Sequence, residues 1–260
     1  MGRMNDRLTC MAYVIPVIYF FEQLILKLQV IIEPFGLEYV QLIIVISVLH
    51  FTEGMLTFFF GSRRSRAVIT YMDNEIAGGY QSYGRWILPL LIFSINGIYV
   101  PILTGIVYFN ETFTKGVEEK AQKMGIVIAL YGIAIMGIHY FIKQGTLSLM
   151  LAMILIPALH ELMMIGDRLY EKGKALYTYP KKGIRLMAFE KAANMPKPFE
   201  WGDIILEINN KPIDSEEDYE AAMVANYVLV HLLKTTGDEL YVVMKKTQLQ
   251  ALSPVFLPRK

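Results

Sequence analysis

The chain has 260 residues, of which 54% are hydrophobic and 19% are charged. Soluble domains carry about 25% charged residues, so this composition excludes a single soluble domain. The net charge of +1 creates no field that would attract nucleic acid, and the single cysteine, Cys10, excludes an internal disulfide and a cysteine-based zinc site.

The hydrophobic residues are concentrated in the first two thirds of the chain. A transmembrane helix needs about 20 mostly apolar residues to cross about 30 Å of hydrocarbon. Five segments meet or nearly meet this requirement and predict an α-helical membrane bundle over residues 1–168, in a multi-pass protein of the cell membrane. These segments are 11–32, 37–60, 86–109, 124–142 and 147–165.

The segments are arranged as helical hairpins with one irregular member. The connections 33–36 and 143–146 are so short that each predicts a hairpin. The first segment continues to Ile32 without a small-residue cleavage site, so we interpret it as a retained membrane segment. The third segment contains Asn96-Gly97 and Pro101, which make it the best candidate for a broken or re-entrant segment.

The side of the membrane that the C-terminal part faces stays open. Arginines follow the second segment, and basic residues also follow the fifth, between Arg168 and Lys174. The positive-inside rule would put both regions in the cytoplasm. That is possible only if one of the five segments does not span.

Residues 169–247 have the pattern of a small α+β domain. Ser215 is predicted to cap a helix whose first turn carries Glu216, Glu217 and Asp218, where carboxylates favour the positive end of the helix. Asn209 and Asn210 predict a turn. Strands are predicted at 175–179, 183–189, 203–208, 227–234 and 239–245, and the tail at 248–260 is expected to be loose.

One run in this region resembles bacterial PDZ domains. It is Gly-Asp-Ile-Ile-Leu-Glu-Ile-Asn-Asn-Lys-Pro-Ile at 202–213, preceded by a strand that begins Gly-Ile-Arg-Leu at 183 and followed by the Ser-Glu-Glu-Asp helix start at 215. The resemblance covers about 175–246. It departs from the family at 190–195, where Glu-Lys-Ala-Ala-Asn-Met replaces a small-residue stretch, and at 170–174, where the loop that would hold a ligand carboxylate matches poorly.

The resemblance implies β-augmentation, in which an extended peptide pairs with an exposed strand and places side chains in a groove beside a helix. The alternative is that the same apolar residues pack the core of the domain. The implied groove residues are Ala175, Leu176, Tyr177, Thr178, Tyr179, Tyr219, Ala222 and Met223.

The order of membrane segments and a C-terminal PDZ-like domain resembles MinJ-type division-site adaptors and, in part, site-2 proteases. It favours a non-enzymatic adaptor at the membrane, in contact with lipid and with a protein or peptide partner, in division-site or envelope organisation. No nucleic-acid partner is expected.

Four ionisable residues in the apolar segments allow a second interpretation. Site-2 proteases bind zinc through His-Glu-x-x-His, but here His160-Glu161 is followed by Met164 where the second histidine is required. His50 and Glu53 share a helix face. The sequence therefore predicts no catalytic residue and no cofactor. Zinc enters only under the alternative of an atypical site-2-type protease with His50, Glu53, His160 and Glu161, which otherwise form a structural polar network or a ligand or proton path.

Overall fold

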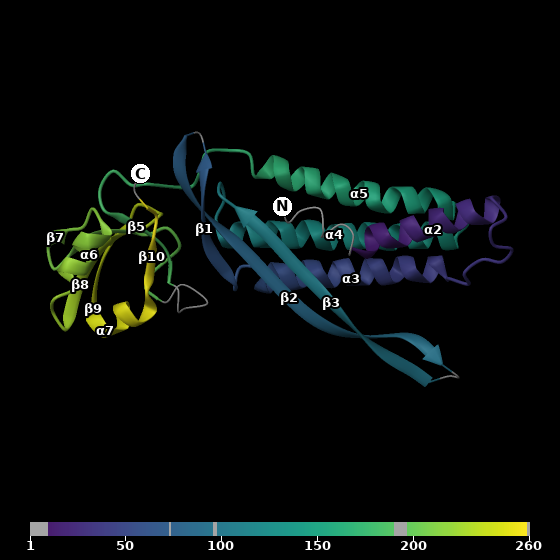
Figure 1. Ribbon diagram of the computed structural model, residues 1–260, viewed down its shortest axis with the longest axis horizontal. Coiled ribbons are helices and arrows are strands. Elements are labelled where there is room, and N and C mark those ends of the chain that lie inside the picture. Colours follow the sequence, from purple (N-terminus) through teal and green to yellow (C-terminus); the bar gives the residue numbers. More distant parts are fainter. Residues whose placement is uncertain (1–9, 73, 96–97, 190–196, 259–260) are drawn as a thin grey trace. The chain divides into compact units, whose positions relative to one another are not determined.

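The computed structural model describes residues 10–258 apart from 73, 96–97 and 190–196, and the side chains of 89–103 and 252 also lie outside the description. The elements are shown in Figure 1. They form two compact units, which are described separately. The helical unit comprises Met1–Phe59, Arg85–Val107 and Gln122–Tyr170, and the sheet unit comprises Phe60–Gly84, Tyr108–Ala121 and Glu171–Lys260.

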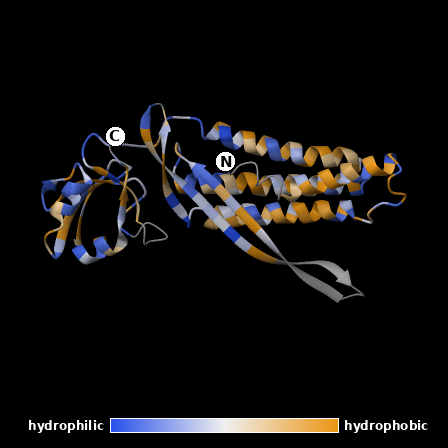
Figure 2. Ribbon diagram, in the orientation of Figure 1, coloured by the Kyte–Doolittle hydropathy of each residue, from blue (hydrophilic) through white to orange (hydrophobic). Residues whose placement is uncertain are grey.

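Long apolar helices dominate the helical unit. Within the described residues, three helices are by length and composition able to cross a membrane: α3 (Tyr39–Phe60), α4 (Val117–Lys143) and α5 (Leu149–Tyr170). Figure 2 shows hydrophobic residues along most of their length. The chain is therefore a membrane protein, as the composition predicts. The helix of the first predicted segment, α2, covers only Met11–Lys27.

The third predicted membrane segment is not a helix. Residues 86–109 belong to β2 (Glu75–Ile95) and β3 (Ile98–Thr112), which are neighbours in a sheet with β1 (Ser65–Met72). The prediction of a helical span here is wrong. The segment contains Pro89 and Pro101, each of which would cost a helix interior about 3 kcal/mol. Asn96-Gly97, which suggested a broken span, lies outside the described residues.

Helices α3 and α4 pack with their backbones in contact. A Cβ on Gly54 would lie 2.3 Å from the backbone nitrogen of Ala129, and one on Gly125 would lie 2.5 Å from that of Phe58. The Ser47 hydroxyl also donates a 2.8 Å hydrogen bond to the carbonyl oxygen of Gly132. Small residues and interhelical hydrogen bonds are the usual means of helix association in lipid, where burial of apolar surface supplies little driving force.

A buried carboxylate connects α2 with α3. Glu22 is 1% exposed and accepts hydrogen bonds from the Phe35 backbone N–H and from the Tyr39 hydroxyl. Lys27, at the end of α2, is exposed. Glu22 thus faces the interior of the helical unit and fixes the connection between the two helices.

The strands form two sheets. In the first, β4 (Tyr177–Thr178) pairs with β2, which lies between β1 and β3. The second has the order β10-β5-β6-β8-β9, with β7 paired to β6. Its strands are β5 (Ile184–Phe189), β6 (Ile204–Ile208), β7 (Lys211–Pro212), β8 (Tyr227–Leu233), β9 (Glu239–Lys245) and β10 (Pro254–Phe256).

Local signals in this region are confirmed. Helix α6 (Glu216–Ala222) begins at Ser215, whose hydroxyl accepts a hydrogen bond from the Asp218 N–H. Asn209 and Asn210 both have positive φ, at 53° and 63°, in the predicted turn.

The C-terminal tail is folded rather than loose. It forms α7 (Lys246–Leu252) and β10, and β10 pairs with β5. Leu249, Phe256 and Leu257 are 1%, 7% and 2% exposed. Apolar side chains in the tail therefore outweigh the two prolines that suggested a loose segment.

Candidate functional site

The segment 175–179, expected to form one wall of a peptide groove, is already paired. The Leu176 N–H donates to the carbonyl oxygen of Phe113 at 2.8 Å. Tyr177 and Thr178 form β4 opposite Gly78 and Ala77 of β2. Ala175 is partly exposed, and the Tyr179 hydroxyl donates to the carbonyl oxygen of Asp214 at 2.9 Å. This segment is therefore not an open strand edge.

The helix residues expected to line the groove lie in the core. Tyr219, Ala222 and Met223 are 6%, 3% and 4% exposed and belong to the hydrophobic cluster of the second sheet. For these three positions the structure favours core packing, the alternative that the sequence left open.

The tail of the chain occupies one edge of β5. Strand β10 pairs antiparallel with β5 through Val255 opposite Ala188 and Phe256 opposite Leu186. The Phe256 ring lies against the Tyr219 ring of α6, with 5.0 Å between centroids. An extended segment thus adds a strand to β5 and places an aromatic side chain against α6.

The turn before β6 makes its polar contacts within the sheet unit. Asp203 is fully buried, and its Oδ2 accepts hydrogen bonds of 2.9 Å from both the Lys234 ammonium and the Glu200 N–H. Burial raises the pKa of Asp203, although these two donors act in the opposite direction. The Arg185 guanidinium donates to the carbonyl oxygens of Thr178 and Gly202. Gly202 and Asp203 therefore accept hydrogen bonds from residues of the sheet unit, as expected of a structural turn.

A second site lies in the helical unit, where Cys10, His50 and His160 converge from the residue before α2, from α3 and from α5. Cys10 Sγ lies 3.5 Å from His50 Nε2 and 3.9 Å from His160 Nε2. One ligand atom of each residue lies within 4.8 Å of the others. His50 is 5% exposed, and the other two are half-buried.

Hydrogen bonds orient both imidazole rings of this cluster. His50 Nδ1 lies 2.8 Å from the carbonyl oxygen of Ile46, which can only accept, so Nδ1 carries the proton. The Tyr13 hydroxyl donates its proton to Glu161 at 2.6 Å and therefore accepts from His160 Nδ1 at 2.8 Å. In both histidines Nε2 is left as the basic nitrogen, and both Nε2 atoms face Cys10.

The structure brings together most of the ionisable residues considered from the sequence. His50 and His160 lie with their ring centroids 5.9 Å apart, and the Tyr13 hydroxyl links His160 to Glu161. His139 is separate, since its Nδ1 lies 2.9 Å from the Val40 carbonyl oxygen. Sequence reasoning missed Cys10 and Tyr13 as members of the cluster. No local pattern could have identified them, because Cys10 lies 40 and 150 residues from the two histidines.

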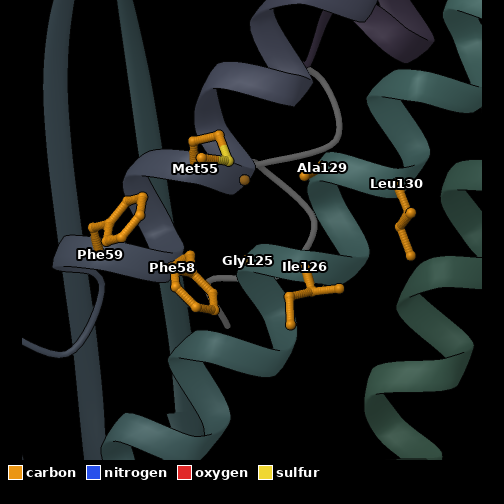
Figure 3. A pocket seen from close by; sticks show the side chains of 8 residues that line it. Met55, Phe58, Phe59, Gly125, Ile126, Ala129 and Leu130 are labelled. Atoms are coloured by element: carbon orange, nitrogen blue, oxygen red, sulfur yellow. The ribbon is translucent and has the colours of Figure 1, made fainter.

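A pocket of about 360 Å³ lies between α3 and α4 (Figure 3). Its lining offers only hydrocarbon and no polar side chain that would orient a ligand. The pocket lies beside the close approach of Gly54 and Gly125. It is lined by Gly54, Met55, Phe58, Phe59, Gly125, Ile126, Ala129 and Leu130.

Comparison of the chain with models of protein families, with curated proteins and with solved structures found no match. Function is therefore inferred from the residues and their geometry.

Proposed function

We propose that this protein is a multi-pass adaptor of the cell membrane, whose C-terminal PDZ-like domain binds an extended segment of a protein partner by adding it as a strand to β5. The element order supports the domain type, since β5, β6, α6, β8 and β9 follow one another as the resemblance implies. The apolar helices provide the membrane attachment.

The pairing of β10 with β5 carries this proposal. A strand edge that lies beside a helix is the geometry that β-augmentation uses, because the main chain supplies affinity and a side-chain pocket supplies selectivity. Here β10 uses the main chain of β5 at Leu186 and Ala188, and Phe256 fills the place against Tyr219. The tail thus acts as an internal ligand, and a partner strand with an aromatic or large aliphatic residue at the position of Phe256 competes with it.

The competition sets the expected affinity. Strand addition with one or two apolar pockets typically gives a Kd on the order of micromolar, or about 8 kcal/mol. A partner must also displace β10, so binding to the intact chain is weaker than binding to a chain without it.

The test uses the chain in detergent, shortened to end at Leu252, and a fluorescent peptide with the sequence of residues 253–260. We expect the peptide to bind the shortened chain at micromolar concentration and the intact chain at least tenfold more weakly. A control peptide with Phe256→Asp should not bind. A peptide array screened against the shortened chain, with the tail peptide as competitor, then defines the preferred partner sequence.

Two results would contradict the proposal. One is equal binding of the tail peptide and its Phe256→Asp control. The other is no binding to a shortened chain whose second sheet is still folded by hydrogen exchange.

A further inference from the structure

We propose that Cys10, His50 and His160 bind one transition-metal ion, with Zn²⁺ the best match, inside the helical unit. This site is independent of the β5 edge. The proposal departs from two expectations from the sequence, namely that the protein has no cofactor and that a single cysteine excludes a cysteine-based zinc site. One cysteine can ligate zinc together with two histidines.

The separations between the donor atoms match a metal site. With zinc–sulfur and zinc–nitrogen bonds of about 2.3 and 2.05 Å, a tetrahedral site has sulfur and nitrogen ligands about 3.6 Å apart. Cys10 Sγ lies 3.5 Å from His50 Nε2 and 3.9 Å from His160 Nε2. Small rotations of the side chains would place all three atoms around one ion.

The hydrogen-bond partners of the histidines are those expected around a metal. Histidine ligands usually donate their second ring N–H to a carbonyl or carboxylate, which fixes the ring and raises the basicity of the ligating nitrogen. His50 donates to the Ile46 carbonyl oxygen, and His160 donates to Tyr13, which in turn donates to Glu161. The result is two basic Nε2 atoms that face one thiol.

The chemistry of the donors selects the ion. Two imidazoles and a thiolate suit zinc and other late transition metals and do not suit Mg²⁺ or Ca²⁺, which prefer oxygen ligands. The Tyr131 ring lies 5.0 Å from the His50 ring and 5.4 Å from the His160 ring, which limits the movement of both.

The test is metal analysis of the full-length protein in detergent after incubation with Zn²⁺ and removal of free ion. We expect about one zinc ion per chain. The variants Cys10→Ser, His50→Gln and His160→Gln should each lose most of the bound zinc. His139→Gln is the matched control, because His139 also lies in an apolar helix but bonds to Val40 outside the cluster, and it should retain the wild-type content.

A cobalt spectrum and a variant of Tyr13, which contacts His160, separate ligation from a structural effect. Co²⁺ bound to the wild type should give a thiolate-to-cobalt charge-transfer band, which Cys10→Ser should abolish even where cobalt remains bound. Tyr13→Phe, which keeps the ring but removes the partner of His160, should weaken zinc binding by about tenfold or more.

The change in Tm on addition of Zn²⁺ is a second measurement of binding, and it does not depend on how much metal each variant carries after purification. Zinc should raise the Tm of the wild type and of His139→Gln but not that of Cys10→Ser. Absence of zinc from a folded wild type, or equal zinc content in the wild type and in the three ligand variants, would overturn the proposal.

Discussion

The Tyr80 hydroxyl donates a 2.8 Å hydrogen bond to the carbonyl oxygen of Met187. The two residues lie on β2 and β5, 107 positions apart, and both are fully buried. The Tyr80 ring also meets Tyr177 and Trp201, with centroid separations of 5.4 and 4.7 Å. The core around the C-terminal strands therefore includes a side chain from the segment between α3 and α4.

This contact predicts that Tyr80 stabilises the C-terminal strands. Tyr80→Phe keeps the ring but leaves the Met187 carbonyl oxygen without this donor, and it should cost about 1–2 kcal/mol. Tyr80→Ala also creates a cavity and should cost about 3–5 kcal/mol. Hydrogen exchange of peptides from 184–189 in the full-length protein measures the effect. Unchanged protection in Tyr80→Ala would contradict the prediction.

Gly202 should not tolerate a side chain. Its φ is +84°, and a Cβ would lie 2.0 Å from the Cε1 atom of Tyr177. Gly202→Ala should therefore destabilise the sheet unit by more than the roughly 1–2 kcal/mol that left-handed backbone alone costs an alanine. Gly237→Ala is the control, because Gly237 has φ +93° but nothing within 4 Å. Equal shifts of Tm in the two variants would show that the Tyr177 contact has no effect.

Met223 should behave as a core residue and not as a binding residue. It is 4% exposed, so Met223→Arg buries an unpaired charge and should unfold the second sheet, at a cost of more than about 3 kcal/mol. Ala221→Arg, on the exposed side of α6, should be close to neutral. Near-UV circular dichroism of the two proteins distinguishes them. A folded Met223→Arg protein with lost peptide binding would instead restore Met223 to the groove.

Local chemistry explains which parts of the fold were predictable. Ser215 caps α6 and Asn209 adopts positive φ because these preferences act within a few residues. The apolar helices were found for the same reason, since a long uncharged run needs no distant partner to identify it.

Apolar length alone, however, did not distinguish a span from two strands. The Asn96-Gly97 dipeptide, which is the strongest short-range signal for a hairpin, was the clue in the sequence to 86–109.

The parts that could not be predicted depend on contacts between distant segments. Cys10 seemed isolated because its partners are on α3 and α5. The pairing of the tail with β5 was not predicted, because nothing near β5 in the sequence indicates that residues 254–256 return to pair there. In both cases tertiary packing decides which residues meet, and no periodicity or spacing records it.

Glu171 should make the stability of the sheet unit depend on pH. Burial would raise the pKa of Glu171, but hydrogen bonds from the N–H groups of Phe113 and Thr114 and from the Lys120 ammonium lower it below its ordinary value of 4.5. Because its pKa is lower in the folded state, the ionised carboxylate stabilises the folded state at pH values above the ordinary pKa of 4.5. This stabilisation is lost as the pH falls through the folded-state pKa.

The variant Glu171→Gln should therefore be less stable than the wild type at neutral pH, by about 2 kcal/mol, and the difference should shrink at a pH below the folded-state pKa. Thermal unfolding of both proteins over this range provides the measurement. Glu118→Gln, at an exposed position of α4, is the control and should change little. A difference that does not vary with pH would mean that the charge of Glu171 is not what stabilises this region.

The contact between α3 and α4 should reject even one methyl group. A Cβ on Gly125 would lie 2.5 Å from the backbone nitrogen of Phe58 and 2.7 Å from the carbonyl oxygen of Gly54, and backbone atoms cannot move aside as a flexible side chain can. Gly125→Ala should separate the helices and destabilise the helical unit by about 1–3 kcal/mol. Gly137→Ala on the same helix has nothing within 4 Å and should be neutral or stabilising by up to about 1 kcal/mol, through the helix propensity of alanine. Because both variants gain the same propensity, the difference between their unfolding transitions in mixed detergent measures the helix contact alone. Equal transitions would show that α3 and α4 do not approach each other this closely.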